Sequence, residues 1–237
     1  MNSQILAKIR NDLKHSVDPK TSGNFQSFFK EKVTCYGVKT GIVSRIAKDY
    51  FEKVKPSGKE GIFLLCEELF KSDYNEEAFI ACEWAYRLRS EYQPGDFAVF
   101  ENWIGKYINN WAKCDTLCNH AVGSFIEKYP GYINHLKNWT KSENRWFRRA
   151  AVVTLIVPAK RGKFLDDIFE IAMSLLTDKD DLVQKGYGWL LKEASRTHQQ
   201  EVFDFVMKNR RSMPRTALRY AIEKMPEALR LKAMRTV

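Results

Sequence analysis

Residues 76–92, EEAFIACEWAYRLRSEY, carry the period of an amphipathic α-helix. Apolar side chains are expected on one side of this helix and charged ones on the opposite side. The apolar set is Phe79, Ile80, Cys82, Trp84 and Leu88. The helical period continues along the chain, and no alternating β-branched run competes with it. The sequence therefore predicts an all-α fold.

The helix around residue 79 has counterparts later in the chain. Asp115, Arg149 and Lys185 occupy similar places in three of them, at separations of 34 (149 − 115) and 36 (185 − 149) residues. A helix that recurs every ~35–45 residues with a partner between is typical of a HEAT-like α-solenoid. We expect one helical-repeat domain over residues 1–237; an irregular helical bundle is the alternative. The segments that can be superimposed on FIACEWAYRL (79–88) are CDTLCNHAVG (114–123), FRRAAVVTLI (147–156), VQKGYGWLLK (183–192) and, less well, PRTALRYAIE (214–223).

Stacked repeats bring equivalent positions onto one face. Trp111 precedes Asp115 by four residues, and Trp189 follows Lys185 by four, so each pair shares a helical face. Individually, a tryptophan of this kind is more often a core residue, the aspartate could complement a helix dipole, and the cations could be solvated. Their coincidence at repeat-equivalent positions favours a single cluster in a basic groove, formed by Trp111, Asp115, Arg149, Lys185 and Trp189.

The chain has a formal net charge of +10, from 39 basic and 29 acidic residues, and a pI of about 9.3. This balance favours a polyanionic partner, either a nucleic acid or an anionic membrane surface. No apolar run is long enough to span a membrane. The number of cysteines, five, is odd, and no signal-peptide pattern precedes them. We therefore expect reduced thiols and a cytoplasmic protein, which is associated with the nucleoid through DNA.

Motifs for metals and cofactors are weak or absent. Cys114, Cys118 and His120 give only three candidate ligands on one helix, without a second cluster. No phosphate-binding loop or nucleophile–histidine arrangement is present. We therefore expect no metal and no cofactor.

Four segments resemble a known family when they are taken together and in order. NWAKCDTLC (110–118) is similar to the Trp-x-x-x-Asp signature of the AlkD-type DNA alkylation repair glycosylases. SENRWFRRAAVVTLI (142–156) and LVQKGYGWLLKEASR (182–196) resemble two later segments of that family, and CYGVKTGIVSRIAK (35–48) resembles an early one. The resemblance spans most of residues 1–225.

The resemblance implies a HEAT-like solenoid whose concave face cradles duplex DNA, and cleavage without a base-specific pocket while the lesion remains stacked. It implies that Trp111 and Trp189 are groove tryptophans, that Asp115 is the catalytic carboxylate, and that Arg149 contacts DNA. An N3- or N7-alkylated purine carries a positive charge and is a good leaving group. A fixed carboxylate would stabilise the charge that develops on the sugar, and indole faces attract cations.

The chain departs from the family pattern at two places. Gly41 stands where the family often has proline, and this affects only an early turn. Ala112 and Lys113 replace acidic or small polar residues next to the carboxylate, which affects the expected substrate range.

The expected partner of the monomer is double-stranded DNA with alkylated bases, and no membrane is expected as a partner. Two alternatives remain, a non-catalytic helical-repeat protein that binds distorted or branched DNA and a protein–protein adaptor. Beside Arg149 and Lys185, the residues expected to contact phosphates are Lys113, Arg148, Lys160, Arg161, Lys163, Lys192 and Arg196.

Overall fold

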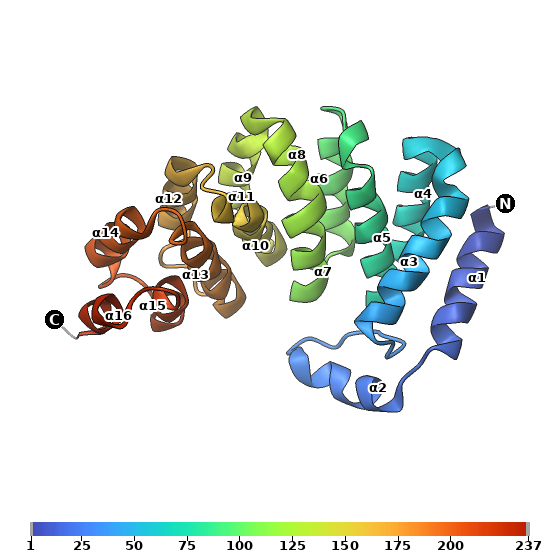
Figure 1. Cartoon of the computed structure of the whole chain (residues 1–237), viewed down its shortest axis with the longest axis horizontal. Helices are drawn as coiled ribbons and strands as arrows, with labels where there is room; N and C mark the ends of the chain where they lie inside the picture. Colours follow the sequence, from blue (N-terminus) through green and yellow to red (C-terminus); the bar gives the residue numbers. More distant parts are fainter. Residues whose placement is uncertain (1, 236–237) are drawn as a thin grey trace. The chain divides into compact units, whose positions relative to one another are not determined.

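The computed structural model describes residues 2–235, and they are helical through most of their length (Figure 1). Within this range no strand forms, and the only β-type pairings are isolated bridges between Val17 and Val38 and between Thr34 and Tyr74. No helix in the same range is long and apolar enough to cross a membrane. The expected all-α fold class is confirmed.

The chain divides into two compact units, Met1–Ala121 and Val122–Val237, and each is described by itself. Repeats that contact only their neighbours can divide in this way, so the prediction of one helical-repeat domain, with a basic concave groove, stays a prediction. The helices of the first unit are α1 (Asn2–His15), α2 (Pro19–Phe25), η1 (Gln26–Phe28), α3 (Thr40–Val54), η2 (Lys55–Ser57), α4 (Gly58–Lys71), α5 (Asn75–Arg87), η3 (Arg89–Glu91), α6 (Asp96–Tyr107) and α7 (Trp111–Thr116). The π-helical turn η4 (Leu117–Val122) contains the boundary, and the second unit continues with α8 (Gly123–Lys128), η5 (Pro130–Tyr132), α9 (Ile133–Trp139), α10 (Arg145–Val153), α11 (Ile156–Lys160), α12 (Leu165–Ser174), α13 (Asp181–Ala194), α14 (Gln199–Asn209), α15 (Arg215–Ile222) and α16 (Glu227–Met234).

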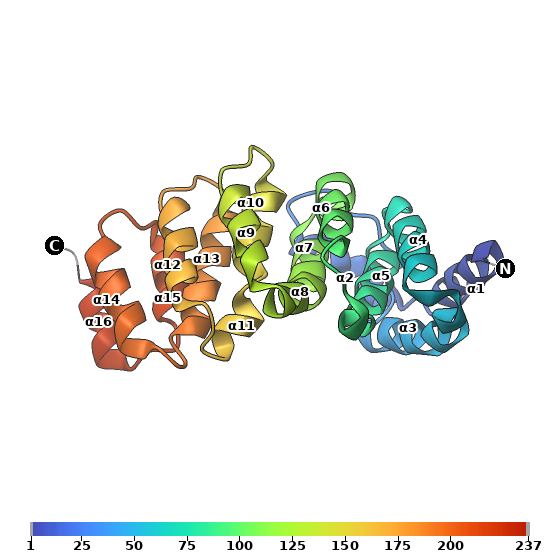
Figure 2. The same cartoon turned by 90° about the horizontal axis from the view of Figure 1, so that it is seen from above.

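The recurring helices predicted from the sequence are α5, α7, α10, α13 and α15, and other helices alternate with them along the chain. Within the first unit α5 packs against α3, α4 and α7, and within the second unit α13 packs against α10, α11, α12 and α15 (Figures 1 and 2). Three of these helices begin in the same way, because the side chains of Asn110, Asn144 and Asp180 each accept a backbone hydrogen bond from the first turn. These caps are spaced by 34 (144 − 110) and 36 (180 − 144) residues, which are the predicted repeat lengths.

Helix α5 differs from its prediction in two respects: it ends at Arg87 and not at residue 92, and two of its charges lie inside the protein. Glu76 and Glu77 are buried, whereas the period had placed charges on the outer face. The carboxylate of Glu76 accepts hydrogen bonds from the backbone N–H groups of Tyr36 (3.0 Å), Gly37 (2.8 Å) and Val38 (3.1 Å). These donors replace water, so burial of the charge is tolerated. Glu76 thereby fixes the loop that leads into α3.

Gly37 is required in this loop for a conformational reason. Its φ is +87°, in the left-handed region, and a side chain there would collide with Ser22 of α2. The backbone N–H of Asp18 donates to the Gly37 carbonyl at 2.9 Å. Glu77 adds an ion pair with Arg10 at 3.1 Å, so α5 anchors α1 as well as the loop.

In the second unit, glycines set the distance between α13 and the helices beside it. A Cβ at Gly186 would lie 2.8 Å from Val152 Cγ2 on α10, and one at Gly188 would lie 2.7 Å from the Ala217 carbonyl oxygen on α15. Distances of this kind are shorter than a carbon can tolerate, so α13 approaches both neighbours closely only because these side chains are absent. The Gly-Tyr-Gly segment thus has a packing role in addition to its resemblance to the family motif.

Candidate active site

The first part of the candidate site is helix α7, which carries Trp111 and Asp115. The buried side chain of Asn110 caps the helix by accepting from the Lys113 N–H at 3.0 Å, and its Nδ2 donates to Asn75 Oδ1 on α5 at 2.9 Å. The start of α7 is therefore fixed against the neighbouring repeat. Trp111 is the first residue of the helix, Asp115 follows one turn later, and both line the same pocket. The expectation that they share a face is confirmed; their catalytic roles stay predictions.

The backbone changes its helical geometry directly after Asp115. Thr116 ends α7, its hydroxyl donates to the Ala112 carbonyl at 2.7 Å, and the π-helical turn η4 begins at Leu117. π-Helical turns interrupt the usual ladder of hydrogen bonds and occur frequently at functional sites. No pattern in the sequence had predicted this turn.

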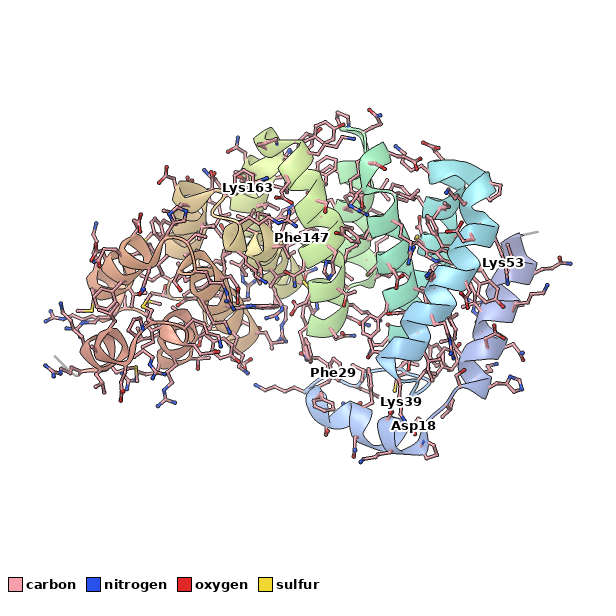
Figure 3. All side chains as sticks on the ribbon, viewed as in Figure 1. Asp18, Phe29, Lys39, Lys53, Phe147 and Lys163 are labelled. Carbon is pink, nitrogen blue, oxygen red and sulfur yellow. The ribbon has the colours of Figure 1, made fainter. Side chains whose placement is uncertain are left out.

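An aromatic stack covers one face of Trp111. Phe29 lies parallel to the indole with ring centroids 5.2 Å apart, and Phe25 stacks on the other side of Phe29 at 5.3 Å. The Trp111 Nε1–H donates to the Phe28 carbonyl at 3.2 Å. Figure 3 shows Phe29 beside α2, in the same part of the chain as the Asp18–Lys39 ion pair of 3.6 Å. We call residues 24–29, NFQSFF, the N-terminal arm. The sequence analysis missed it, although three phenylalanines in an otherwise polar stretch mark it.

Lys113 does not lie where the sequence analysis expected a phosphate contact. Its side chain is buried, and its Nζ donates to the carboxylate of Asp73 at 2.6 Å, to the Asp73 carbonyl at 3.0 Å and to Asn109 Oδ1 at 3.1 Å. All three ammonium hydrogens thus have protein acceptors. The cation faces the loop before α5, and its predicted contact with DNA stays a prediction.

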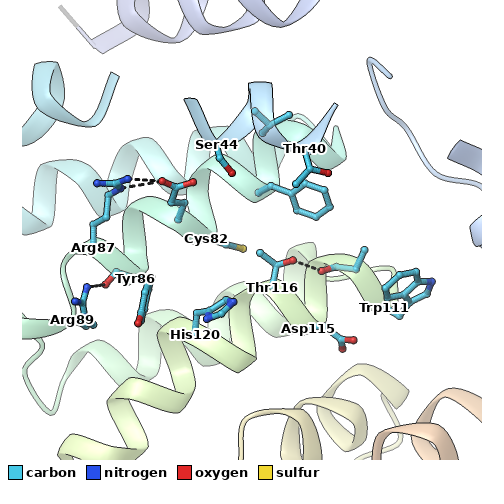
Figure 4. Close-up of a pocket in the computed structure, with 14 residues that line it drawn as sticks. Thr40, Ser44, Cys82, Tyr86, Arg87, Arg89, Trp111, Asp115, Thr116 and His120 are labelled. Atoms are coloured by element: carbon cyan, nitrogen blue, oxygen red, sulfur yellow. Dashed lines mark hydrogen bonds and ion pairs between the residues drawn. The ribbon is translucent and has the colours of Figure 1, made fainter. Parts of the chain in front are cut away.

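In the first unit a pocket of about 700 Å³ opens between α3 and α7, with α5 as its floor (Figure 4). Trp111 lies at one end, and Tyr86 and His120 lie at the other. Asp115 lies at the rim, on the side of α7 that faces away from α3 in this view. The pocket therefore adjoins the predicted catalytic carboxylate.

The second unit holds Arg149, Lys185 and Trp189. Asp115, Arg149 and Lys185 each stand four residues after the first residue of their helix, as repeat equivalence requires. Arg149 is nevertheless only 5% exposed, and its guanidinium donates to the Leu182 carbonyl on α13. The small size of Gly186 lets α13 approach the guanidinium, since a Cβ there would lie 3.6 Å from Arg149 Nη1. The guanidinium thus has a partner within its own unit, and its predicted contact with a phosphate stays a prediction.

Trp189 and Lys185 are half-buried residues of α13. Lys185 pairs with Asp181 at 3.4 Å within the helix. Trp189 makes no ring contact and no hydrogen bond with its side chain among residues 2–235, so its indole differs from that of Trp111 in being uncovered by another aromatic ring. Because Trp111 and Asp115 belong to one unit and the other three residues to the second, the single predicted cluster stays a prediction.

Most of the other cations predicted to bind phosphates are paired with carboxylates. Lys160 is the exception: it is exposed and has no acidic partner in the described part of the chain. The paired residues are Arg148 with Asp178 (2.8 Å), Arg161 and Lys163 with Glu127 (2.9 and 3.0 Å), Lys192 with Glu223 (3.0 Å) and Arg196 with Glu193 (2.5 Å).

Unpaired cations lie instead on α14, on α15 and in the turn between them, which the sequence analysis overlooked. They are exposed and have no acidic partner within residues 2–235. The signal that could have found them is the stretch KNRRSMPRTALR (208–219), which contains no acidic residue. The cations are Lys208, Arg211, Arg215 and Arg219.

No group of three or more histidine, cysteine, aspartate or glutamate side chains suited to a metal ion occurs in the described range. Cys114 and Cys118, which had raised that possibility, are buried thiols of the core.

Three comparisons relate the chain to known proteins. The model of a family described as DNA alkylation repair enzyme matches residues 9–225. No curated protein matches the sequence. Among solved structures, the chain is similar to a predicted DNA alkylation repair enzyme from Enterococcus faecalis, with a TM-score of 0.80 and 17% identity, over 90% of this chain and 98% of that chain. At this level of identity the structural likeness concerns the fold.

Proposed function

Because this chain belongs to the family of DNA alkylation repair enzymes, we propose that it is a DNA glycosylase that acts on positively charged N3- or N7-alkylated purines in duplex DNA. The substrate is DNA bound by a monomer, and the product is an abasic site for base excision repair. The observation that carries the proposal is the placement of Trp111 and Asp115, one turn apart on α7 and on the wall of the same pocket.

The reaction is a hydrolysis. The bond between C1′ and the purine nitrogen breaks, and its electron pair neutralises the charged ring. Water adds to C1′ and loses its proton, so the products are a neutral alkylpurine and an abasic sugar. Because the leaving group is already cationic, no acid is needed to protonate it, and the uncatalysed barrier lies mainly in the positive charge that builds on the sugar.

Asp115 is suited to this task because its position is fixed. A carboxylate held at the rim stabilises the oxocarbenium-like charge and orients the attacking water. Capping by Asn110 fixes the start of the helix on which Asp115 lies. The indole of Trp111 attracts the cationic lesion, by about 0.5–2 kcal/mol depending on desolvation.

The test is release of 7-methylguanine and 3-methyladenine from methylated duplex DNA. We expect release by the natural protein and none by Asp115→Asn, with DNA affinity retained, because the amide keeps the shape and removes the charge. Asp166→Asn on α12 is the matched control, since Asp166 is exposed and lies outside the pocket. Release by Asp115→Asn at the natural rate would contradict the catalytic assignment. Binding without release by the natural protein would favour the non-catalytic DNA-binding alternative.

A further inference from the structure

Helix α7 begins a longer helical segment, and its connection to the next part of that segment is irregular. The π-helical turn η4 follows it over Leu117–Val122, and α8 begins at Gly123. A π-helical turn interrupts the regular ladder of backbone hydrogen bonds, so α8 does not fix α7 as a continuous α-helix would. The position of Asp115 therefore depends on the side chains that attach α7 to its own unit.

These attachments all lead to the loop between α4 and α5. The Lys113 side chain is only 1% exposed, and its Nζ donates to the carboxylate of Asp73 at 2.6 Å and to the Asp73 carbonyl at 3.0 Å. Asn109 closes a ring of hydrogen bonds, because its Nδ2 donates to Asp73 at 2.7 Å and its Oδ1 accepts from Lys113 at 3.1 Å. A second, fully buried attachment joins Asn110 to Asn75 at 2.9 Å. We call the ring formed by Asp73, Asn109 and Lys113 the α7 clamp.

The backbone of Asp73 has a left-handed conformation, with a φ of +64°. Its N–H donates to the Phe70 carbonyl at 3.1 Å, just after the end of α4. Glycine is the usual residue at such a position, because a side chain there is strained. Glycine would make the same turn without strain, but it would lack the carboxylate that Lys113 and Asn109 bind. The aspartate is thus explained by the α7 clamp and not by the turn.

The loop that carries Asp73 is itself fixed. The backbone N–H of Asn75 donates to the Thr34 carbonyl at 2.9 Å, and Thr34 forms a β-bridge with Tyr74. On the other side of the ring, the buried ammonium of Lys113 cannot leave its acceptors without a large desolvation penalty. Both ends of the α7 clamp are therefore held in place.

We propose that Asp73 and Lys113 are positioning residues that hold Asp115 where the reaction needs it, a proposal that rests on the glycosylase function proposed above. Lys113 precedes Asp115 by two residues, so the two side chains leave α7 in different directions. The lysine reaches the loop before α5, whereas Figure 4 shows Asp115 on the side of α7 that faces away from α3. A displacement of about 1 Å at a reacting group can lower a rate by about 100-fold.

The experiment measures single-turnover release of 7-methylguanine from methylated duplex DNA by Lys113→Met, per folded molecule. Lys59→Met is the matched control, because Lys59 forms a buried ion pair with Asp96 at 2.9 Å in the same unit, between α4 and α6. We expect Lys113→Met to lower the maximal rate at least about tenfold, and to change the half-saturating DNA concentration by less than about threefold. Lys59→Met should change both by less than about threefold. Equal maximal rates in the two variants would overturn the proposal.

Asp73→Asn and the double variant Asp73→Asn/Lys113→Met test whether the two residues act as one unit. If they act through the same ion pair, the double variant should lose about as much rate as the more affected single variant. Losses that multiply would overturn the proposal. Each single variant also replaces the other in the rate measurement if one of them does not fold.

Amide hydrogen exchange of residues 111–118, measured without DNA, separates this proposal from the glycosylase function. We expect exchange there to be at least about tenfold faster in Lys113→Met than in Lys59→Met, because α7 opens locally when the α7 clamp is lost. Base release by the natural protein, with rates and exchange unchanged in Lys113→Met, would overturn the positioning role and leave the glycosylase. No release by the natural protein, with faster exchange in Lys113→Met, would overturn the glycosylase and leave the attachment of α7.

Discussion

The indole of Trp111 stacks on the ring of Phe29 at 5.2 Å, so a residue from the N-terminal arm covers one face of a candidate active-site tryptophan. We predict that Phe29→Ala destabilises the protein by about 1–2 kcal/mol, because it removes both the stacking and a half-buried apolar surface. Urea denaturation measures this change.

Phe28→Ala is the matched control for that measurement. The Phe28 side chain is 68% exposed, and the residue contacts Trp111 through its backbone carbonyl, which the substitution keeps. Its effect should lie within about 0.5 kcal/mol of zero. Equal destabilisation by the two variants would mean that the stack does not hold the arm.

The pair formed by Lys113 and Asp73 leads to an asymmetric prediction. Asp73→Asn removes the charged acceptor from a buried ammonium and should cost about 1.5–3 kcal/mol. Lys113→Met should cost less, because Asp73 is half-exposed and returns to water when its partner is lost. Asparagine also suits the positive φ of 64° at residue 73, so backbone strain does not confuse the comparison. Urea denaturation of both variants measures which substitution lowers the free energy of unfolding more.

The same lysine variant tests its proposed role in DNA binding. A buried, paired lysine displaces no counterion from DNA, so Lys113→Met should leave the slope of log affinity against log salt unchanged. A decrease of about one in that slope would show that Lys113 contacts a phosphate.

Gly188 allows a test of the close packing between α13 and α15. Alanine normally stabilises a helix by about 1 kcal/mol relative to glycine. At residue 188, however, its Cβ would lie 2.7 Å from the Ala217 carbonyl oxygen, and separating the helices should cost about 1–3 kcal/mol. We expect a net loss of stability in Gly188→Ala.

Gly23→Ala in α2 is the control, since a Cβ there meets nothing within 4 Å. This variant should be neutral or slightly more stable in thermal unfolding. If Gly188→Ala behaved in the same way, the two helices would be free to move apart.

The sequence predicted the helices and their repeat because both depend on local pattern. The apolar period marks α5, α7, α10, α13 and α15, and the predicted spacing between Asp115, Arg149 and Lys185 returns in the structure as the spacing of three helix caps. Trp111 and Asp115 could be paired in advance because they are one helical turn apart.

The side-chain environments could not be predicted, because they depend on segments distant in sequence. Arg149 is buried by the approach of α13, which Gly186 permits. Lys113 is buried by a partner 40 residues earlier. The same holds for other cations that were expected to contact phosphates, since residues such as Arg148 have acidic partners elsewhere in the unit. A positive charge in a sequence says nothing about the carboxylate that the fold places beside it.

The unpaired cations of α15 give the last prediction. Arg215 and Arg219 are one turn apart, exposed, and without an acidic partner within residues 2–235. DNA is the substrate of this family, and an unpaired cation that neutralises a phosphate contributes about 0.9 to the salt slope of duplex binding. We predict that the double variant Arg215→Ala/Arg219→Ala lowers the slope by about two and weakens binding uniformly across DNA sequences. Arg161→Ala is the control, because Arg161 is already paired with Glu127 at 2.9 Å and should lower the slope by less than half as much per residue. A double variant with an unchanged slope would remove α15 from the DNA interface, and a large effect of Arg161→Ala would show that its ion pair opens when DNA binds.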